Sequence, residues 1–236
     1  MGSVGKEVSG GGLALRPVDT SRNVDLTTQF EFETGISVSK KVMMSTDGQT
    51  LADLYDTIRG MRQQYPTLMS GLRTIADETD NTSFAKTNGI TLRVNTAYFG
   101  NTQGLDTLYA STVASGFHPA GTTWRDIDAH ELGHVALRGA GAKMYSDPAQ
   151  MAREWSNGKM PARIVHEAYE EIKSAPNSYG FPGKLPTESA LRAAISQYAT
   201  KNFHETVGEA WADYHANGNG SRALSRAIVA VLNRYA

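Results

Sequence analysis

The sequence contains no cysteine and no long apolar run, and these two absences exclude several classes of protein. Without cysteine, the 236-residue chain forms neither disulfides nor a thiolate metal site, so His, Asp and Glu are its strong metal ligands. No stretch approaches the roughly 20 apolar residues that span a bilayer, and the N-terminus lacks the apolar core of a secretory signal. We therefore expect no membrane association and a location that is cytoplasmic, or exported or virion-associated by a non-classical route.

An excess of charge of one sign is also missing. The chain has 23 basic and 24 acidic residues, a formal net charge of -1, and no run of five like charges. This balance gives no electrostatic footprint for nucleic acid, so we expect no nucleic-acid partner. Hydrophobic residues make up 40% and charged residues 20%, which is ordinary for a folded globular chain.

The order of residue patterns predicts an α+β fold with a small mixed sheet in the N-terminal half and a mainly helical C-terminal half. Residues 1–25, with a run of glycines, predict a flexible lead-in, and residues 26–236 predict one domain in which 26–120 could form a subdomain. Apolar and polar residues alternate within 27–44, which predicts two strands. Residues 89–100 are rich in β-branched and aromatic side chains and predict another strand.

Helical periodicity is clear in other segments. Residues 49–66 place five apolar residues on one face and stop at a proline: Leu51, Leu54, Tyr55, Ile58 and Met61. Residues 67–78 predict a second helix, whereas the Gly, Pro and Ser content of 104–124 predicts an irregular or extended segment. From Thr122 or Thr123 a capped helix is expected to about Arg138, ended by Gly139 and Gly141. Further helices are predicted near 147–156, 161–174, 187–200, 203–216 and 220–235.

The stretch "DIDAHELGHVALRG", residues 126–139, gives the strongest indication of a functional site in this sequence. Residues four apart share one face of a helix, so His130 and His134 can direct ring nitrogens at one point, about 2.0 to 2.1 Å from each as zinc requires. Glu131 projects to where an activated water would lie and can serve as the base. The apolar neighbours favour a buried metal site over two unrelated histidines.

A catalytic zinc site needs a third protein ligand and an open position. The best source is residues 197–218, where Glu205, Glu209 and Asp213 recur every four residues on one helical face. Three acids in a row repel one another unless a cation holds them, so one is expected as ligand and another as a brace for a histidine. The residues alone leave Glu205 and Glu209 open, and Glu209 with Asp213 is a second possible register.

Here the sequence resembles the zincin metallopeptidases of the glutamate-ligand (gluzincin) class, and among them the type represented by the catalytic domain of anthrax lethal factor. That type joins HExGH, present as "HELGH", to a later helix with a tyrosine, six residues, a ligand glutamate and another acid four residues on. "YATKNFHETVGEAWADY" matches from Tyr198 through Glu205 to Glu209. The resemblance implies a zincin-like fold, zinc held by His130, His134 and Glu205, and Tyr198 stabilising an oxyanion. Residues 116–134 also resemble zincin-like domains of phage head proteins and bacterial toxins.

The remaining histidines favour structural roles. His118, in a loop beside a proline, could line a substrate cleft but is more often simply exposed. His204 points about 100° away from the favoured ligand around the helix, and His166 and His215 fit a charged helix face and a helix end. Residues 90–96 or 108–115 could form a sheet edge on which an extended peptide lies.

These patterns together predict a Zn²⁺-dependent endopeptidase acting on a protein or peptide substrate, with a toxin-type or a phage-associated protease as the two expected kinds. The rival interpretation is a non-catalytic zincin-like structural or binding module that keeps the metal for stability. Glu131 discriminates between them, because it binds no metal in the predicted site and has no evident structural use.

Overall fold

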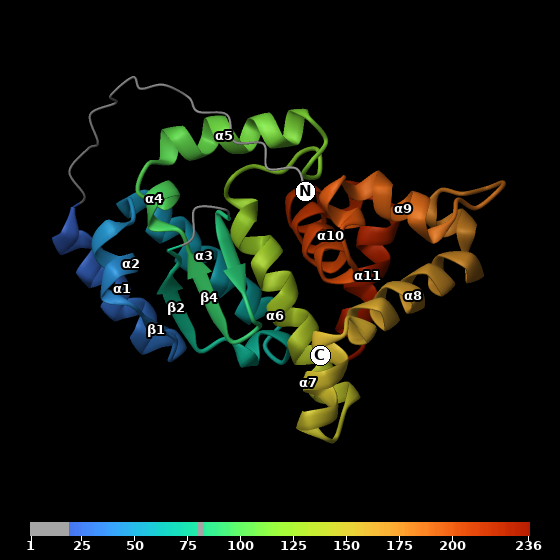
Figure 1. Ribbon diagram of the computed structural model, residues 1–236, viewed down its shortest axis with the longest axis horizontal. Helices are drawn as coiled ribbons and strands as arrows, with labels where there is room; N and C mark the ends of the chain where they lie inside the picture. Colours follow the sequence, from blue (N-terminus) through green and yellow to red (C-terminus); the bar gives the residue numbers. More distant parts are fainter. Residues whose placement is uncertain (1–18, 80–82) are drawn as a thin grey trace.

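The computed structural model describes residues 19–79 and 83–236 and has an α+β architecture (Figure 1). A small mixed sheet lies in the N-terminal half and helices make up the C-terminal half, as the sequence predicts. Residues 1–18 of the predicted lead-in lie outside the described residues. Residues 20–25, also assigned to that lead-in, belong instead to the first helix.

Helix α1 (Thr20–Thr34) replaces the first strand predicted within 27–44, which was therefore wrong. Phe30 is buried and stacks on Tyr55, with the ring centroids 4.1 Å apart. In a strand Phe32 would share the inner face with Phe30, yet it is 91% exposed. The rest of the segment contains only a two-residue strand and a short helix, β1 (Ser37–Val38) and α2 (Lys40–Ser45).

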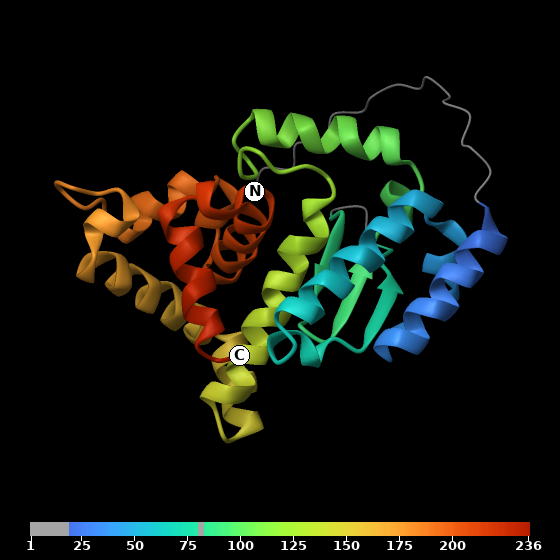
Figure 2. The ribbon, with the colours of Figure 1, turned by 180° about the vertical axis from the view of Figure 1, so that it is seen from behind.

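Helix α3 (Gly48–Gln64) confirms the helix predicted over 49–66. Asp47 caps it by accepting hydrogen bonds from the first turn. Seen from behind, α3 lies across one face of the sheet (Figure 2). The five apolar residues predicted to share its inner face are all buried: Leu51, Leu54, Tyr55, Ile58 and Met61.

The sheet has the order β1-β2-β4-β3, with β2 (Thr74–Asp77), β3 (Ala85–Thr87) and β4 (Thr91–Val94). Strands β1, β2 and β4 are parallel, whereas β3 runs antiparallel to β4 at the edge. The strand predicted over 89–100 is confirmed as β4, although its second half is the short helix α4 (Thr96–Phe99). Because β4 lies between β2 and β3, it is not the sheet edge proposed for residues 90–96.

Two other expectations for this half were wrong. Residues 67–78 form a 3₁₀ turn (Leu68–Gly71) and then β2 rather than a helix, because the Arg73 N–H donates to the Ile90 carbonyl at 2.8 Å across the sheet. Residues 104–124, expected to be irregular, begin with most of helix α5 (Thr102–Ala114). Leu105 and Tyr109, one turn apart, are its buried residues. The edge proposed for 108–115 is therefore largely helical.

Helix α6 (Asp126–Met144) carries the HELGH motif and is almost entirely buried. Its N-cap is Arg125, which makes no side-chain cap, so the cap predicted at Thr122 or Thr123 was wrong. The Thr123 backbone N–H donates instead to the carboxylate of Asp126 in the first turn, at 2.8 Å. Gly139 and Gly141 do not end it as predicted. Both lie where another segment approaches closely, the Leu68 backbone at the first and the Met160 side chain at the second, so they are packing positions within the helix.

The second half contains the helices that the periodicity predicts. The region predicted as one helix over 187–200 is divided into α9 and a 3₁₀ turn at Tyr198–Thr200. The helices are α7 (Pro148–Ser156), α8 (Lys159–Ser174), α9 (Glu188–Ile195), α10 (Phe203–Asn217) and α11 (Ala223–Asn233).

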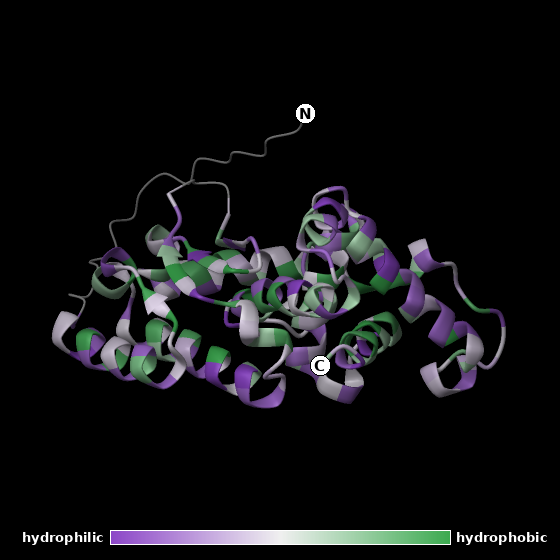
Figure 3. Ribbon diagram, turned by 90° about the horizontal axis from the view of Figure 1, so that it is seen from below, coloured by the Kyte–Doolittle hydropathy of each residue, from purple (hydrophilic) through white to green (hydrophobic). Residues whose placement is uncertain are grey.

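Helix α6 joins the two halves, because it packs on β3 on one side and on α10 on the other (Figures 1 and 2). One continuous set of buried apolar residues runs from the sheet through α6 to α8 and α11. Hydrophobic and hydrophilic residues alternate along the helices, as amphipathic packing requires (Figure 3). Within the described ranges, the helices are all too short or too polar to cross a membrane.

Candidate metal centre

Helix α6 directs both motif histidines into one buried position. His130 and His134 are 9% and 8% exposed, and their Nε2 atoms lie 3.2 Å apart. The spacing of four residues produces this arrangement, because one helical turn brings the two rings to the same face. The two-histidine clamp predicted from the motif is therefore present in the geometry.

Helix α10 supplies a carboxylate to the same position. Glu205 stands in its first turn, where the Asn202 side chain caps the helix by accepting from the Glu205 N–H at 3.0 Å. Its Oε2 lies 3.3 Å from Nε2 of His130 and 3.8 Å from Nε2 of His134. Tetrahedral zinc bonds of 2.0 to 2.1 Å place ligand atoms about 3.3 Å apart. The three atoms thus form a group that could hold a metal ion.

Two glycines allow α6 and α10 to approach closely enough for this. A Cβ on Gly133 would lie 2.7 Å from Cβ of Trp211, and a Cβ on Gly208 would lie 2.7 Å from Nε2 of His130. Both distances are shorter than side chains tolerate. The close approach of the two helices therefore requires glycine at both positions.

Glu209, the alternative third ligand, takes a different position. Its Oε1 lies 2.8 Å from Nδ1 of His130, on the far side of that ring from Glu205, and 3.0 Å from Nδ1 of His118. Its Oε2 accepts from the Ser196 hydroxyl at 2.7 Å. The Glu209 carboxylate thus orients His130, as carboxylates do behind metal-binding histidines.

Asp213, the third acid of the row, does not take part in this cluster. It accepts from the Arg222 N–H at 2.8 Å and pairs with the Arg222 guanidinium. Glu205 and Glu209 thus stand where a ligand and a brace for a histidine were expected, and Asp213 takes neither position. Glu205 and Glu209 lie on opposite sides of one ring, and Asp213 has its own arginine.

The charge state of the histidines reflects the two carboxylates. Burial acts to lower the pKa of His130, but hydrogen bonds with Glu205 and Glu209 outweigh it and hold that pKa well above the usual value. Burial and the charge of His130 lower the pKa of His134 to about 3. Burial opposes ionisation of Glu205, yet its hydrogen bond with His130 brings its pKa down to about 2. A proton on His130 therefore occupies the place that a cation would take, and metal must displace it.

Glu131 lies beside this group without being part of it. It is 6% exposed, and its Oε2 has no hydrogen-bond partner among the described residues. Burial raises its pKa to about 7, although the charge of His130 and a hydrogen bond from the Thr87 backbone act against the rise. A carboxylate with a pKa near neutrality can accept and release protons at physiological pH.

Tyr198 reaches the same cleft from the 3₁₀ turn before α10. Its ring centroid lies 6.0 Å from that of His130, and its hydroxyl is 3.2 Å from Nζ of Lys201. Burial first, and then the Glu205 carboxylate, raise the pKa of Tyr198, which keeps the phenol protonated. Its backbone N–H donates to the Phe117 carbonyl at 3.1 Å, so the loop after α5 holds this turn in place.

His118, the histidine in the loop after α5, was expected to be exposed but belongs to the cleft. His118 lines the cleft, stacks on Tyr109 with centroids 4.9 Å apart, and shares the Glu209 carboxylate with His130. Its distance of 91 residues from Glu209 left no local signal. The other three histidines have partners outside the metal group, which supports the structural roles expected for them. His204 contacts the Trp155 carbonyl, His166 contacts Glu188, and His215 contacts Asp126.

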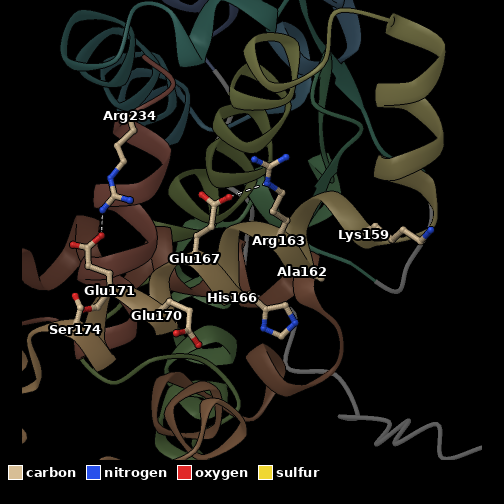
Figure 4. Close-up of a pocket in the computed structure, with 9 residues that line it drawn as sticks. All are labelled: Lys159, Ala162, Arg163, His166, Glu167, Glu170, Glu171, Ser174 and Arg234. Carbon is tan, nitrogen blue, oxygen red and sulfur yellow. Dashed lines mark hydrogen bonds and ion pairs between the residues drawn. The ribbon is translucent and has the colours of Figure 1, made fainter.

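The cleft has a volume of about 610 Å³ and brings together all the predicted site residues: His130, Glu131, His134, Tyr198, Glu205 and Glu209. A larger hollow of about 720 Å³ lies along α8 and shares no lining residue with the cleft (Figure 4). Its charged groups neutralise one another, since Arg163 pairs with Glu167 and Arg234 with Glu171. It offers no comparable set of reactive groups.

The donor set fits zinc. Two imidazole nitrogens and one carboxylate oxygen are common zinc ligands, and here the three atoms lie 3.2 to 3.8 Å apart. The group could therefore hold a metal ion of this kind. Scans against protein-family models and searches of curated proteins and solved structures found no match to this chain.

Proposed function

We propose that this protein is a zinc-dependent endopeptidase with a zincin-like fold. The observation that carries the proposal is the meeting of three ligand atoms from α6 and α10 beside a buried, unpaired Glu131 oxygen in one open cleft. Each part has a distinct use in peptide hydrolysis. A merely structural metal site needs no carboxylate held ready beside it.

His130, His134 and Glu205 would hold the ion, and Glu209 would keep the His130 ring oriented. Bound zinc supplies Lewis acidity, which lowers the pKa of a water and polarises a carbonyl. Glu131 takes the proton from the water and returns it to the leaving amine. The protonated Tyr198 phenol donates a hydrogen bond to the carbonyl oxygen as that oxygen gains charge.

The edge strand β3 gives the cleft a direction for an extended substrate. Its residues, Ala85–Thr87, line the cleft next to Glu131 and stand at the outer side of the sheet. A peptide that adds to a sheet edge is held by its backbone, and its carbonyl groups then lie in register with the edge. We place the substrate backbone along β3 with its scissile carbonyl facing His130 and Glu131.

The test combines metal analysis with two matched glutamate variants. Zinc content is measured by elemental analysis, and hydrolysis is followed by mass spectrometry on casein and on a proteome-derived peptide mixture. Glu131→Gln should keep zinc and lose hydrolysis, whereas Glu170→Gln, on the exposed face of α8, should keep both. The peptide mixture is included because a toxin-type enzyme with one target would leave casein intact.

Two results would contradict the proposal in different ways. Wild-type protein that holds zinc but cleaves none of the peptides would favour the non-catalytic zincin-like module. Wild-type protein that binds no zinc at a one-to-one ratio would remove the basis for both interpretations.

A further inference from the structure

The cleft has an apolar side that the hydrolytic groups do not use. This side is formed by five lining residues that we call the aromatic wall. The wall comes from the residue before β3, from α4, from α5 and from the loop that follows α5. Its members are Phe84, Tyr98, Leu108, Tyr109 and Phe117.

Contacts between rings hold much of this wall in one arrangement. Phe84 packs edge-on against Tyr98 with centroids 5.0 Å apart, and it meets Tyr109 at 6.1 Å. Tyr109 is 2% exposed and hydrogen-bonds to Thr122, so its ring is fixed from behind. Phe117 is joined to the hydrolytic side by its ring contact with Tyr198 at 5.0 Å. A wall built in this way is preformed for a ligand.

Two members of the wall remain open to the cleft. Leu108 is 42% exposed and Phe117 is 39% exposed, which places them among the few large apolar side chains so exposed in the described part of the chain. A single exposed apolar residue is ordinary, but two that line the same concave site as a metal group indicate a contact surface for a ligand.

We propose that the aromatic wall binds one large apolar side chain, aromatic or long aliphatic, of the peptide whose backbone crosses the metal group. This specificity rests on the proposed peptidase function. The wall contains no charged group, so a charged side chain there would lose water without gaining a partner. The charged residues that line the cleft have partners of their own: Lys86 pairs with Glu78, and Lys201 lies 4.0 Å from Glu205.

The size of the cleft agrees with this occupant. A volume of about 610 Å³ is within the range of small-ligand sites and leaves room for a short extended segment with one large side chain. The position of the wall next to Tyr198 places that side chain close to the scissile bond. The wall therefore selects which peptide bond is presented.

The experiment measures binding directly, so that it does not depend on turnover. Full-length protein carrying Glu131→Gln is supplemented with zinc, and its methyl groups are followed by NMR. The probes are acetyl-Gly-Phe-Gly-amide and acetyl-Gly-Asp-Gly-amide. The Leu108 methyl signals should shift as the phenylalanine peptide is added, and the shift should saturate. The protein should bind the aspartate peptide at least tenfold more weakly. The Ile90 methyl signals, at 37% exposure outside the cleft, should not move.

Matched variants separate the wall from general surface effects. Leu108→Ala and Phe117→Ala should each weaken binding of the phenylalanine peptide about five- to tenfold, because each removes part of the apolar contact. Ile90→Ala removes a side chain of similar size and exposure elsewhere and should leave binding unchanged.

The outcomes also distinguish this inference from the peptidase itself. If wild-type protein cleaves peptides but Leu108 signals stay unmoved, or move equally with both probes, the wall is not a specificity site and the peptidase stands. If nothing is cleaved but the phenylalanine peptide shifts Leu108 selectively, the wall binds apolar side chains and the hydrolytic proposal fails alone. A shift with octanoate and none with the peptide would assign the wall to an acyl chain and overturn the inference.

Discussion

Replacing Gly208 with alanine should damage the metal centre while leaving the fold intact. A Cβ at this position would lie 2.7 Å from Cε1 and Nε2 of His130, whereas ordinary contact begins at 3.4 Å. The imidazole must therefore retreat by about 0.7 Å, which is a large error for a metal ligand. The ring cannot retreat freely, because Glu209 holds its Nδ1 at 2.8 Å.

The expected magnitudes can be worked from two opposing effects on the free energy of unfolding. Alanine is favoured over glycine inside a helix by about 1 kcal/mol. Overpacking a buried contact costs about 1 to 3 kcal/mol. The Gly208→Ala variant should thus range from unchanged to about 2 kcal/mol less stable without metal. Its zinc affinity should fall about 10- to 100-fold, as when the groups that orient a metal ligand are changed.

Gly60 provides the matched control. It lies within α3, and a Cβ there would meet no atom within 4 Å. Gly60→Ala should therefore gain the helix-propensity term of about 1 kcal/mol and keep its zinc affinity. Urea unfolding of the metal-free proteins gives the stabilities, and competition with a chromogenic chelator gives the affinities. Gly208→Ala protein that is stabilised as much as Gly60→Ala and binds zinc equally well would refute the predicted clash with His130.

Three further predictions concern the acids around the centre. Glu205→Gln should reduce zinc affinity more than Glu209→Gln does, because the first removes a proposed ligand and the second removes only the group that orients His130. Loss of such an orienting group reduces metal affinity about 10- to 100-fold. Equal losses of affinity in chelator competition would contradict these roles. Zinc binding should release protons and weaken below neutral pH, because the raised pKa of His130 keeps that ring protonated without metal. Calorimetry in buffers of different ionisation enthalpy counts the released protons, and a count of zero would refute this prediction. Asp128→Asn should raise the melting temperature at pH 7.5. Burial, followed by the charge of Glu131, raises the Asp128 pKa, so ionisation of this carboxyl destabilises the folded state at high pH. The gain in melting temperature should vanish as the pH falls below 4, where the carboxyl is protonated in the folded and unfolded states alike. A gain in melting temperature that is constant with pH would be inconsistent with this cause.

The local patterns that proved reliable are those in which one helical face meets one core. The apolar spacing in α3 and in the C-terminal helices is repeated often enough to predict them, and the HELGH spacing alone places His130 and His134 together. The preference for Glu205 agrees with the geometry, although that preference came from a resemblance and not from the spacing of the three acids.

The failures occurred where a partner distant in the chain decides the conformation. The alternation that includes Phe30 and Phe32 predicts a strand, but the segment forms a helix in which Phe30 stacks on Tyr55. Residues 74–77 became a strand because β4 lies beside them. Both segments are short, so local propensity is weak and pairing with another segment outweighs it.

The sequence by itself determined the kind of ligands available and the one turn of helix that pairs two of them, since absence of cysteine and a four-residue spacing are local facts. Only the tertiary structure decided that Glu205 faces the ligand nitrogens while Glu209 stands behind His130 and joins it to His118. It also decided that the aromatic wall opens onto the same cleft. The reason is physical: residues as far apart in the chain as Phe84 and Glu209 line one cleft only when α5, α6 and α10 pack, and that packing depends on the whole core.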